Sequence, residues 1–224
     1  MSLARPLRVL LLGAPGSGKG TQTSKLLKHM TLPAISSGDL LRREIQQGTA
    51  IGQEAKKVIA DGALLPDETI STIIVNELQS QKLLTEQSDW LLDGFPRTLN
   101  QAKILERDLQ NAQLNLVVEL KVPESVILNR IENRWVHIPS GRVYNLEYSP
   151  PKVAGKDDVT GEPLSKRPDD TAAVFQKRLD TYNATIGPVI DFYKTKGVLR
   201  SVEGETSDII FPKLLSLIKN EFDR

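Results

Sequence analysis

Short apolar runs alternate with longer amphipathic stretches along most of the chain. Four runs are short, apolar and bounded by turn or polar residues, which is typical of buried strands: 7–13, 89–93, 114–122 and 197–202. Between and beyond them, the pattern predicts helices over 20–30, 38–47, 52–61, 67–82, 98–110, 123–134, 169–186 and 206–221. This alternation predicts an α/β fold, in which a parallel sheet carries helices on both faces.

Residues 135–170 interrupt the alternation. This stretch is rich in Pro, Gly and Asp, contains β-like pieces such as GRVYNLEY, and has no helical period. A structureless connection of this length is uncommon inside a compact domain. We therefore expect a small insert with its own β structure, and such an insert on an α/β core is a candidate for a moving lid.

Composition narrows the class of protein. The 224 residues suffice for one substantial core, with room for a smaller insert. A formal net charge of +1 gives no reason to expect a nucleic-acid partner. The chain has no cysteine, which excludes disulfides, thiolate catalysis and cysteine-rich zinc sites. No apolar run approaches the roughly 20 residues that span a bilayer, so no membrane segment is expected.

The amino-terminal stretch MSLARPLRVLLLG has two arginines and no acid before an apolar run, and it faintly resembles a targeting segment. The better interpretation is that LRVLLLG forms a buried first strand, because too little chain precedes it for a cleaved signal. A mitochondrial address inside the mature chain stays open as an alternative.

The stretch GAPGSGKGTQ, which begins at Gly13, nearly matches the nucleotide-binding P-loop pattern G-x-x-x-x-G-K-[ST]. Gly13, Gly18 and Lys19 are in register, but Gly20 stands where a hydroxyl is expected and Thr21 follows one place late. The loop leaves an apolar strand and enters a helix, so its N–H groups and the helix dipole would face a phosphate chain. Lys19 would reach the terminal phosphates. Phosphate binding is favoured over a structural glycine turn.

The residue after Lys19 distinguishes kinds of P-loop. GTPases and motor ATPases use a Ser or Thr at that position together with an acid to hold magnesium. With Gly20 there, the metal would depend more on the nucleotide's own oxygens, on water and on an acid elsewhere. A regulatory GTPase would also need a guanine-reading N-K-x-D segment, and the sequence contains none.

Two further motifs would supply a second phosphate pocket. In ISSGDLLR, Ser36 or Ser37 begins a helix and Arg42 lies about one turn beyond Gly38. Taken alone, this is better explained as an ordinary capped helix with a solvated arginine.

In WLLDGFPRTLNQ, a buried strand ends at Asp93, Gly94 and Pro96 form a stiff bend, and Arg97 projects from the carboxyl end of the sheet. Open α/β sheets bind ligands at that edge. Asp93 could orient magnesium-bound water and Arg97 could grip a phosphate with two hydrogen bonds. A binding site is favoured over a structural turn.

The motifs GAPGSGKGT, SSGDLLR, DGFPRTLNQ and GRVYN, with arginines flanking the insert, resemble those of the adenylate kinase family in the same order. The resemblance covers essentially the whole chain and its long-lid form. It implies a P-loop NTPase-type core over 1–35, 66–133 and 172–224. It also implies a helical AMP-binding arm over 36–65 and a β-rich lid over 134–171 that closes on the donor nucleotide.

The resemblance implies roles for individual residues. For the donor nucleotide it implies contacts with Gly16, Ser17, Gly18, Lys19, Gly20, Thr21, Arg130, Arg134, Val143, Tyr144, Gly204, Thr206 and Ser207. For AMP it implies Ser37, Arg42, Ala63, Leu64, Leu65, Gly94, Phe95, Pro96, Arg97, Gln101, Arg167 and Arg178, with Gln101 reading the adenine edge. The implied catalytic groups are Lys19, Arg97, Arg134, Arg167, Arg178 and Asp93, which would bind Mg²⁺ through water.

Two of these positions carry further expectations. A lysine often found in the family at the position of Ala63 is absent, so only the backbone can contact AMP there. Arg130 is expected one helical turn before Arg134, on the same face, where it could stack on the donor base.

Some lids of the family hold zinc with four cysteines. The corresponding positions here are His137, Ser140, Asp157 and Thr160, which make a poor zinc cage and a good hydrogen-bond network. We therefore expect Mg²⁺ with the nucleotide and no zinc.

The T-x-x-Q pattern from Thr98 to Gln101 resembles that of the AMP-specific enzymes. GRVYN and the tail GETSDIIFP resemble the mitochondrial GTP:AMP phosphotransferases within the family. The resemblance implies a monomer that uses GTP and AMP in the mitochondrial matrix. The alternatives are ATP as donor, the cytoplasm as location and, more remotely, a GTPase switch or a nucleotide-binding protein without catalysis.

Overall fold

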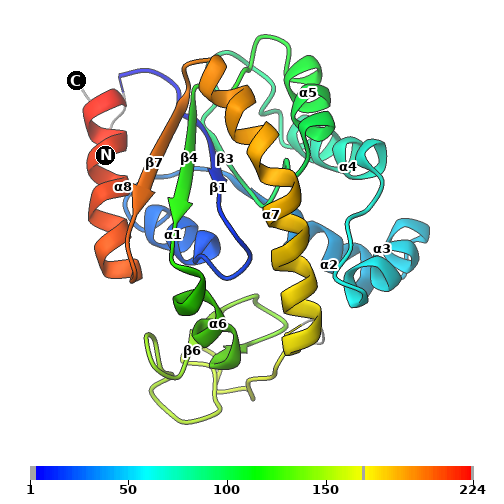
Figure 1. Ribbon diagram of the computed structural model, residues 1–224, viewed down its shortest axis with the longest axis vertical. Helices are drawn as coiled ribbons and strands as arrows, with labels where there is room; N and C mark the ends of the chain where they lie inside the picture. The colour runs from blue at the N-terminus through cyan, green and yellow to red at the C-terminus, as the bar shows by residue number, and fades with distance from the viewer. Residues whose placement is uncertain (1–3, 168–169, 223–224) are drawn as a thin grey trace.

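The computed structural model describes residues 4–167 and 170–222. Its centre is a five-stranded sheet in the order β2-β3-β1-β4-β7, in which every neighbouring pair is parallel (Figure 1). Parallel strands need crossover connections, and helices make them here. Because all five strands run the same way, their carboxyl ends lie at one edge, where such sheets bind ligands. The strands are β1 (Arg8–Leu12), β2 (Ala34–Ser36), β3 (Trp90–Asp93), β4 (Leu116–Lys121) and β7 (Leu199–Glu203).

Helices cover both faces of the sheet and bury two hydrophobic cores. In β1, Leu10 and Leu12 face one core, while Val9 and Leu11 face the other, as the two-residue period of a strand requires. The first core packs against α4 (Asp67–Ser80), α5 (Leu99–Asp108) and α7 (Ala172–Thr195). The second packs against α1 (Lys19–Leu26) and α8 (Ser207–Phe222). The α/β fold with a doubly covered parallel sheet is thereby confirmed.

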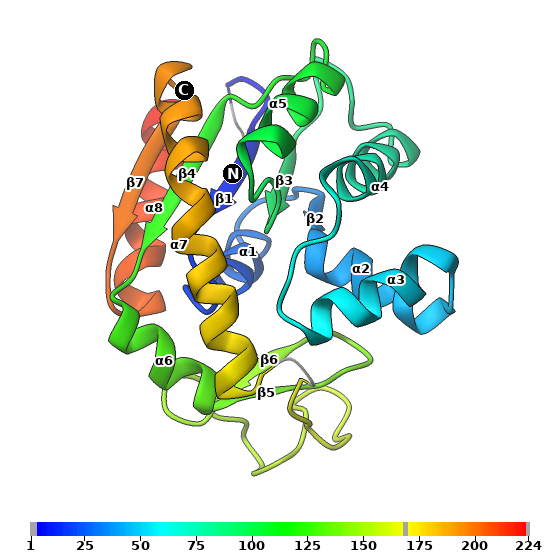
Figure 2. The same cartoon turned by 45° about the vertical axis from the view of Figure 1, so that its right-hand side comes forward.

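The helices α2 (Ser37–Gln47) and α3 (Ala50–Ala60) form an arm beyond the β2 edge of the sheet (Figure 2). Side chains cap both helices, since Ser36 Oγ accepts from the Asp39 N–H and Thr49 Oγ1 accepts from the Gly52 N–H. Gly48 ends α2 in a left-handed conformation, with φ of 68°. These local signals explain why the chain turns back here.

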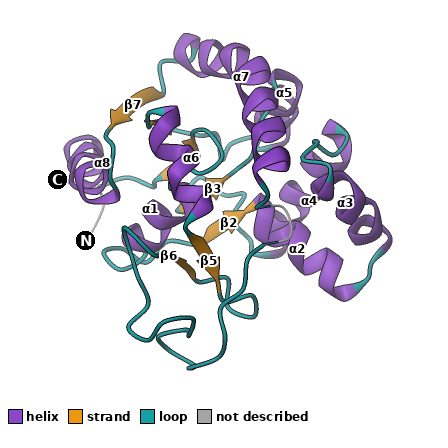
Figure 3. Cartoon of the chain, turned by 60° about the horizontal axis from the view of Figure 1, so that its bottom comes forward, coloured by secondary structure: helices purple, strands orange, loops and turns teal. Residues whose placement is uncertain are grey.

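The strands β5 (Arg134–Val136) and β6 (Val143–Asn145) follow α6 (Glu124–Glu132) and precede α7 in the chain. They pair antiparallel in a small second sheet beside the end of α6 (Figure 3). Further bridges join Val136 to Ser165 and Lys156 to Pro163. The predicted β structure of this insert is confirmed.

Several predicted element boundaries are wrong. The strand β2 was missed because only three residues pair, and α1 ends at Leu26 instead of residue 30. The helix predicted over 123–134 ends at Glu132, and Arg134 begins β5, so Arg130 and Arg134 are not on one helix. The difference arises because Arg134 pairs with Asn145 of the facing strand instead of continuing the helix.

The helix α7 also departs from its prediction. The predicted start at residue 169 lies outside the described residues, and α7 runs from Ala172 through Gly187 and Pro188 to Thr195. Pro188 removes one backbone donor, which normally kinks or ends a helix. The burial of Val189 and Tyr193 against the sheet offsets that loss. Among the described helices, none is both long and apolar enough to span a membrane.

Candidate active site

The P-loop connects β1 to α1 at the carboxyl edge of the sheet. Gly18 precedes α1 with φ of 91°, a left-handed conformation that favours glycine. Lys19, the first residue of α1, folds back so that its Nζ donates to the carbonyls of Gly13 at 2.7 Å and Ala14 at 3.0 Å. The loop and its lysine are therefore already arranged around the helix N-terminus, where backbone N–H groups favour an anion.

Four more residues predicted for catalysis act electrostatically on Lys19. Burial lowers the pKa of Lys19 to about 8; the charge of Asp93 opposes this, and the charges of Arg97, Arg178 and Arg134 lower the pKa further. These groups come from the end of β3, the loop after it, α7 and β5. The structure thus brings together positive side chains that are far apart in the sequence.

Asp93 ends β3 and faces the start of α1. A Cβ atom added at Gly20 would lie 3.7 Å from Asp93 Oδ2, so the missing side chain leaves this carboxylate open towards the loop. Burial raises the pKa of Asp93, and the charges of Lys19 and Arg97 oppose that rise. Mg²⁺ is commonly held by one or two carboxylates together with substrate phosphates and water. The described residues contain no group of three potential metal ligands among His, Asp and Glu.

A cavity lies between the arm, the loop after β3 and α7. Of the residues predicted to hold AMP, all but Pro96 and Arg167 line it. The sequence analysis missed the walls formed by Gly38, Leu41, Val58, Ile59, Gly62 and Ile70. Apolar positions at helical spacing in the arm were the available signal, but the same spacing also describes an ordinary buried helix face.

The loop after β3 is fastened to the arm at Gly94. Ser37 Oγ donates to the Gly94 carbonyl at 2.8 Å, and Arg97 Nε donates to the same oxygen at 2.7 Å. Gly94 has φ of 81°, and a Cβ there would lie 2.8 Å from Ser37 Oγ. Only glycine suits this turn. On the arm, Arg42 forms an ion pair with Asp39 and its guanidinium lies beside Gly38, as its spacing predicted.

Arg134 and Asp170 lie at the two ends of the lid, and Arg134 Nε donates to the buried carboxylate of Asp170, at Oδ2, over 2.8 Å. The sequence analysis missed Asp170. Arg167 ends the segment that pairs with β5 through Ser165, and the Asp170 N–H donates to the Arg167 carbonyl at 3.1 Å. These contacts hold two of the predicted catalytic arginines at the lid base.

Arg130, in α6, joins the P-loop to the segment before α8. Its Nη1 donates to the Ser17 carbonyl at 3.2 Å, and its Nη2 donates to the Glu205 carbonyl at 2.7 Å. A Cβ at Gly18 would lie 3.8 Å from Ser207 Oγ. The segment 204–207, predicted to contact the donor base, therefore lies directly beside the P-loop.

Val143 and Tyr144 differ in orientation within β6. Val143 is 44% exposed, whereas Tyr144 is only 7% exposed. The Tyr144 hydroxyl donates to Asp157 Oδ1 at 2.9 Å and accepts from the Asp158 N–H at 2.8 Å. The hydroxyl is thus directed into the lid, so a donor contact by Tyr144 would have to use its backbone or ring.

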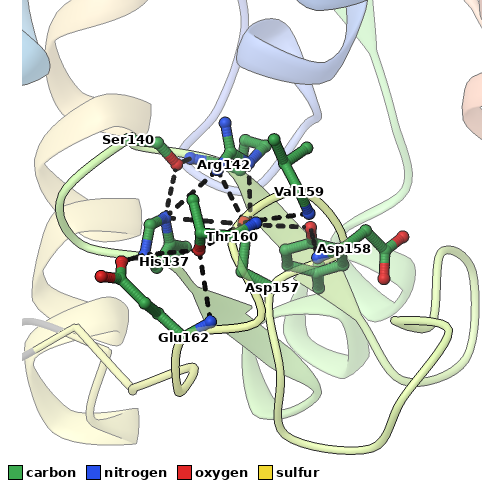
Figure 4. A network of polar contacts seen from close by, with 9 residues as sticks. His137, Ser140, Arg142, Asp157, Asp158, Val159, Thr160 and Glu162 are labelled. Atoms are coloured by element: carbon green, nitrogen blue, oxygen red, sulfur yellow. Dashed lines mark hydrogen bonds and ion pairs between the residues drawn. The ribbon is translucent and has the colours of Figure 1, made fainter.

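The four lid positions compared with zinc ligands lie in one polar network (Figure 4). His137 Nδ1 contacts Ser140 Oγ at 2.7 Å, and Thr160 Oγ1 donates to Asp157 Oδ2 at 3.0 Å. Arg142 adds a two-pronged ion pair with Asp157, at 2.7 and 2.6 Å, and holds the pKa of this carboxyl below its usual range. Arg142, Tyr144 and Glu162 are members that the sequence analysis missed.

A family model described as adenylate kinase matches residues 11–198. The chain is 60% identical over 223 residues to a "GTP:AMP phosphotransferase, mitochondrial" of Saccharomyces cerevisiae. The alignment covers 98% of this chain and 95% of the relative. It is 42% identical over 214 residues to a protein of the same description from Drosophila melanogaster. That alignment covers 96% of this chain and 95% of the relative.

Proposed function

This chain belongs to the adenylate kinase family and is a nucleoside monophosphate kinase, and we propose that it transfers the terminal phosphoryl group of GTP to AMP. The observation that carries the proposal is the convergence of Lys19, Arg97, Arg134 and Arg178 between the P-loop and the arm cavity. A donor phosphate chain on the P-loop would face an acceptor in the cavity across these charges.

The physics of phosphoryl transfer explains how a group of positively charged side chains can supply most of the catalysis. The transition state spreads negative charge over the equatorial oxygens of the transferred group, so positioning and electrostatic stabilisation supply most of the rate. Lys19 would hold the donor's terminal phosphates, and Arg97 and Arg178 would hold the acceptor phosphate. The phosphate of AMP is already ionised at neutral pH, so no strong general base is required.

Residues 36–65 would act as the acceptor arm and residues 134–171 as the lid. Closure of the lid would bring Arg134 and Arg167 onto the transferred group and exclude water, which would otherwise hydrolyse the donor. Mg²⁺ would supply positive charge between the phosphates, and the Asp93 carboxylate would hold it through water. The polar lid network would keep its shape without zinc.

Support for GTP as donor comes from the relatives, which are described as GTP:AMP phosphotransferases. In this chain, Gly204, Thr206 and Ser207 would contact the donor base. The carbonyls of Glu205 and Ser207 accept from Arg130 and Gln22, which holds this segment in place beside the P-loop.

The test is ADP formation from AMP by the purified protein with GTP, ATP or ITP at equal magnesium. Fast turnover with GTP and little with ATP is expected. ITP shares the 6-oxo group of GTP and lacks its 2-amino group, so its rate shows which group is read. Preference for ATP would overturn the donor assignment and leave an ordinary adenylate kinase, whereas no turnover with any donor would contradict phosphoryl transfer itself.

The relatives are described as mitochondrial, and we propose a mitochondrial location, in the matrix, for a monomeric enzyme. Protease protection after selective opening of the outer membrane tests the compartment. Digestion under those conditions would contradict the matrix assignment, and sedimentation at micromolar concentration tests the monomer.

A further inference from the structure

Asp67, the first residue of α4, reaches across to the start of α5. Its Oδ1 accepts hydrogen bonds from Gln101 Nε2 at 2.8 Å and from Thr98 Oγ1 at 3.1 Å. Its Oδ2 accepts from Asn100 Nδ2 at 3.1 Å. One carboxylate therefore binds three side chains of the T-x-x-Q turn, and the sequence analysis did not single it out.

These contacts fix the direction of the Gln101 amide. At its other end, Gln101 Oε1 accepts from the Arg97 N–H at 2.7 Å. An ionised carboxylate only accepts hydrogen bonds and a backbone N–H only donates, so the amide cannot exchange its oxygen and nitrogen. Gln101 is 2% exposed and lines the arm cavity, so this fixed direction is presented to whatever the cavity holds.

The fixed amide leaves one N–H and one oxygen lone pair for a ligand. Adenine offers an amino donor beside a ring-nitrogen acceptor, which a glutamine amide can match with two hydrogen bonds. Hypoxanthine carries a carbonyl oxygen in place of the amino group and a protonated ring nitrogen beside it. It therefore offers an acceptor where adenine offers a donor, and a donor where adenine offers an acceptor. A base of the second kind would need the reversed amide.

We propose that Asp67 is a positioning residue that makes the acceptor site select a 6-aminopurine over a 6-oxopurine by fixing the direction of the Gln101 amide. This rests on the proposed function, in which the cavity takes the acceptor nucleotide. Asp67 touches Gln101 and not the substrate, so its effect appears in the choice of acceptor and in acceptor affinity. The donor site is not expected to respond.

The test measures kcat/KM for AMP and for IMP with GTP as the fixed donor. Asp67→Ala removes the acceptor oxygen and frees the amide to rotate, and the AMP-to-IMP ratio is expected to fall about tenfold, as for loss of a charged hydrogen bond. Asp67→Asn is expected to retain the ratio, because its amide oxygen can replace Oδ1. Glu68→Ala, in the same helical turn, is the matched control and is expected to behave as wild type.

Asp67→Ser provides a second removal variant in case the alanine protein fails to fold, since serine suits a helix start but its oxygen is too short to reach Gln101. An unchanged ratio in the removal variants would overturn the inference. So would an equal loss in Asp67→Asn, because it would assign the effect to charge at the helix start. A wild-type protein that does not phosphorylate AMP would instead contradict the proposed function.

Discussion

Lys19 illustrates how burial and neighbouring charge set the chemistry of one residue. Its ammonium group lies under the P-loop, bonded to two backbone carbonyls and subject to the charges of three arginines. Desolvation and like charge both disfavour the protonated form, and Asp93 offsets them only in part. A donor phosphate chain would remove this imbalance, because it supplies the negative charge that the free site lacks.

Donor affinity is therefore expected to fall as pH rises through about 8, the pKa of Lys19 in the free protein. Above that pH the unbound lysine is neutral and has to take up a proton when phosphate binds, so affinity falls about tenfold between pH 7 and pH 9. Calorimetric titration with GTP measures this. Lys19→Arg stays cationic throughout and should give a flat profile, and an equally steep profile in that variant would contradict the assignment.

Arg97→Ala is expected to lower kcat by about 10³-fold or more, the range for a transition-state arginine. The thermal unfolding midpoint should change little, because Arg97 lines the cavity in the loop after β3 and belongs to neither of the two hydrophobic cores. Arg43→Ala is the control: Arg43 of α2 pairs with Glu77 of α4 and does not line the cavity. Normal turnover by the Arg97 variant would rule out its proposed role.

At the scale of elements, the arm meets α7 through a glycine. Gly62 follows α3 with φ of 67°, and a Cβ there would lie 3.0 Å from the Val174 carbonyl and 3.2 Å from Arg178 Cγ. Gly48 follows α2 with nearly the same φ, 68°, but a Cβ there would meet nothing within 4 Å. The two positions share backbone strain and differ only in packing.

Gly62→Ala is expected to raise KM for AMP about tenfold, because the added methyl group holds the arm away from α7 and widens the cavity. Gly48→Ala should leave KM unchanged. Both variants should lose about 1 kcal/mol of unfolding free energy from the left-handed backbone, measured by urea denaturation. Equal KM values in the two variants would show that the contact with α7 does not position the arm.

The polar network of the lid predicts which part of the lid is protected from local unfolding. Asp157→Ala removes the acceptor shared by Arg142, Tyr144 and Thr160, and amide hydrogen exchange in β5 and β6 is expected to accelerate on the order of tenfold. Asp158→Ala removes only an exposed bond to the Lys152 N–H and should exchange as wild type. If amide hydrogen exchange in the Asp157→Ala variant stays at the wild-type rate, the network does not stabilise the lid.

For the whole molecule, the same network bears on metal content. His137, Ser140, Asp157 and Thr160 are bonded to one another and to Glu162 and Arg142. We therefore expect these bonds to join the two halves of the lid without an ion. Protein purified without added metal is expected to contain no stoichiometric zinc by mass spectrometry. Its unfolding midpoint should be unchanged by EDTA, and a large fall on chelation would contradict the prediction.

Much of the architecture follows from local sequence. The strand and helix order, the P-loop and the turn after β3 could be predicted because apolar period, glycine conformation and turn chemistry act over a few residues. The three residues of β2 could not, since they pair only because β3 lies beside them. The continuation of α7 through Pro188 could not either, because burial against the sheet outweighs a local helix breaker.

The residues that have the chemistry for this site can be identified from the chain alone: a phosphate loop, one acid and a set of arginines in family order. Which of these residues contact one another depends on the folded arrangement of the elements. The grouping of Arg97, Arg134 and Arg178 around Lys19, the Arg134–Asp170 pair and the hold of Asp67 on Gln101 each join residues from different elements. Such contacts depend on how the elements pack, and packing is the sum of many distant interactions that no short stretch of sequence contains.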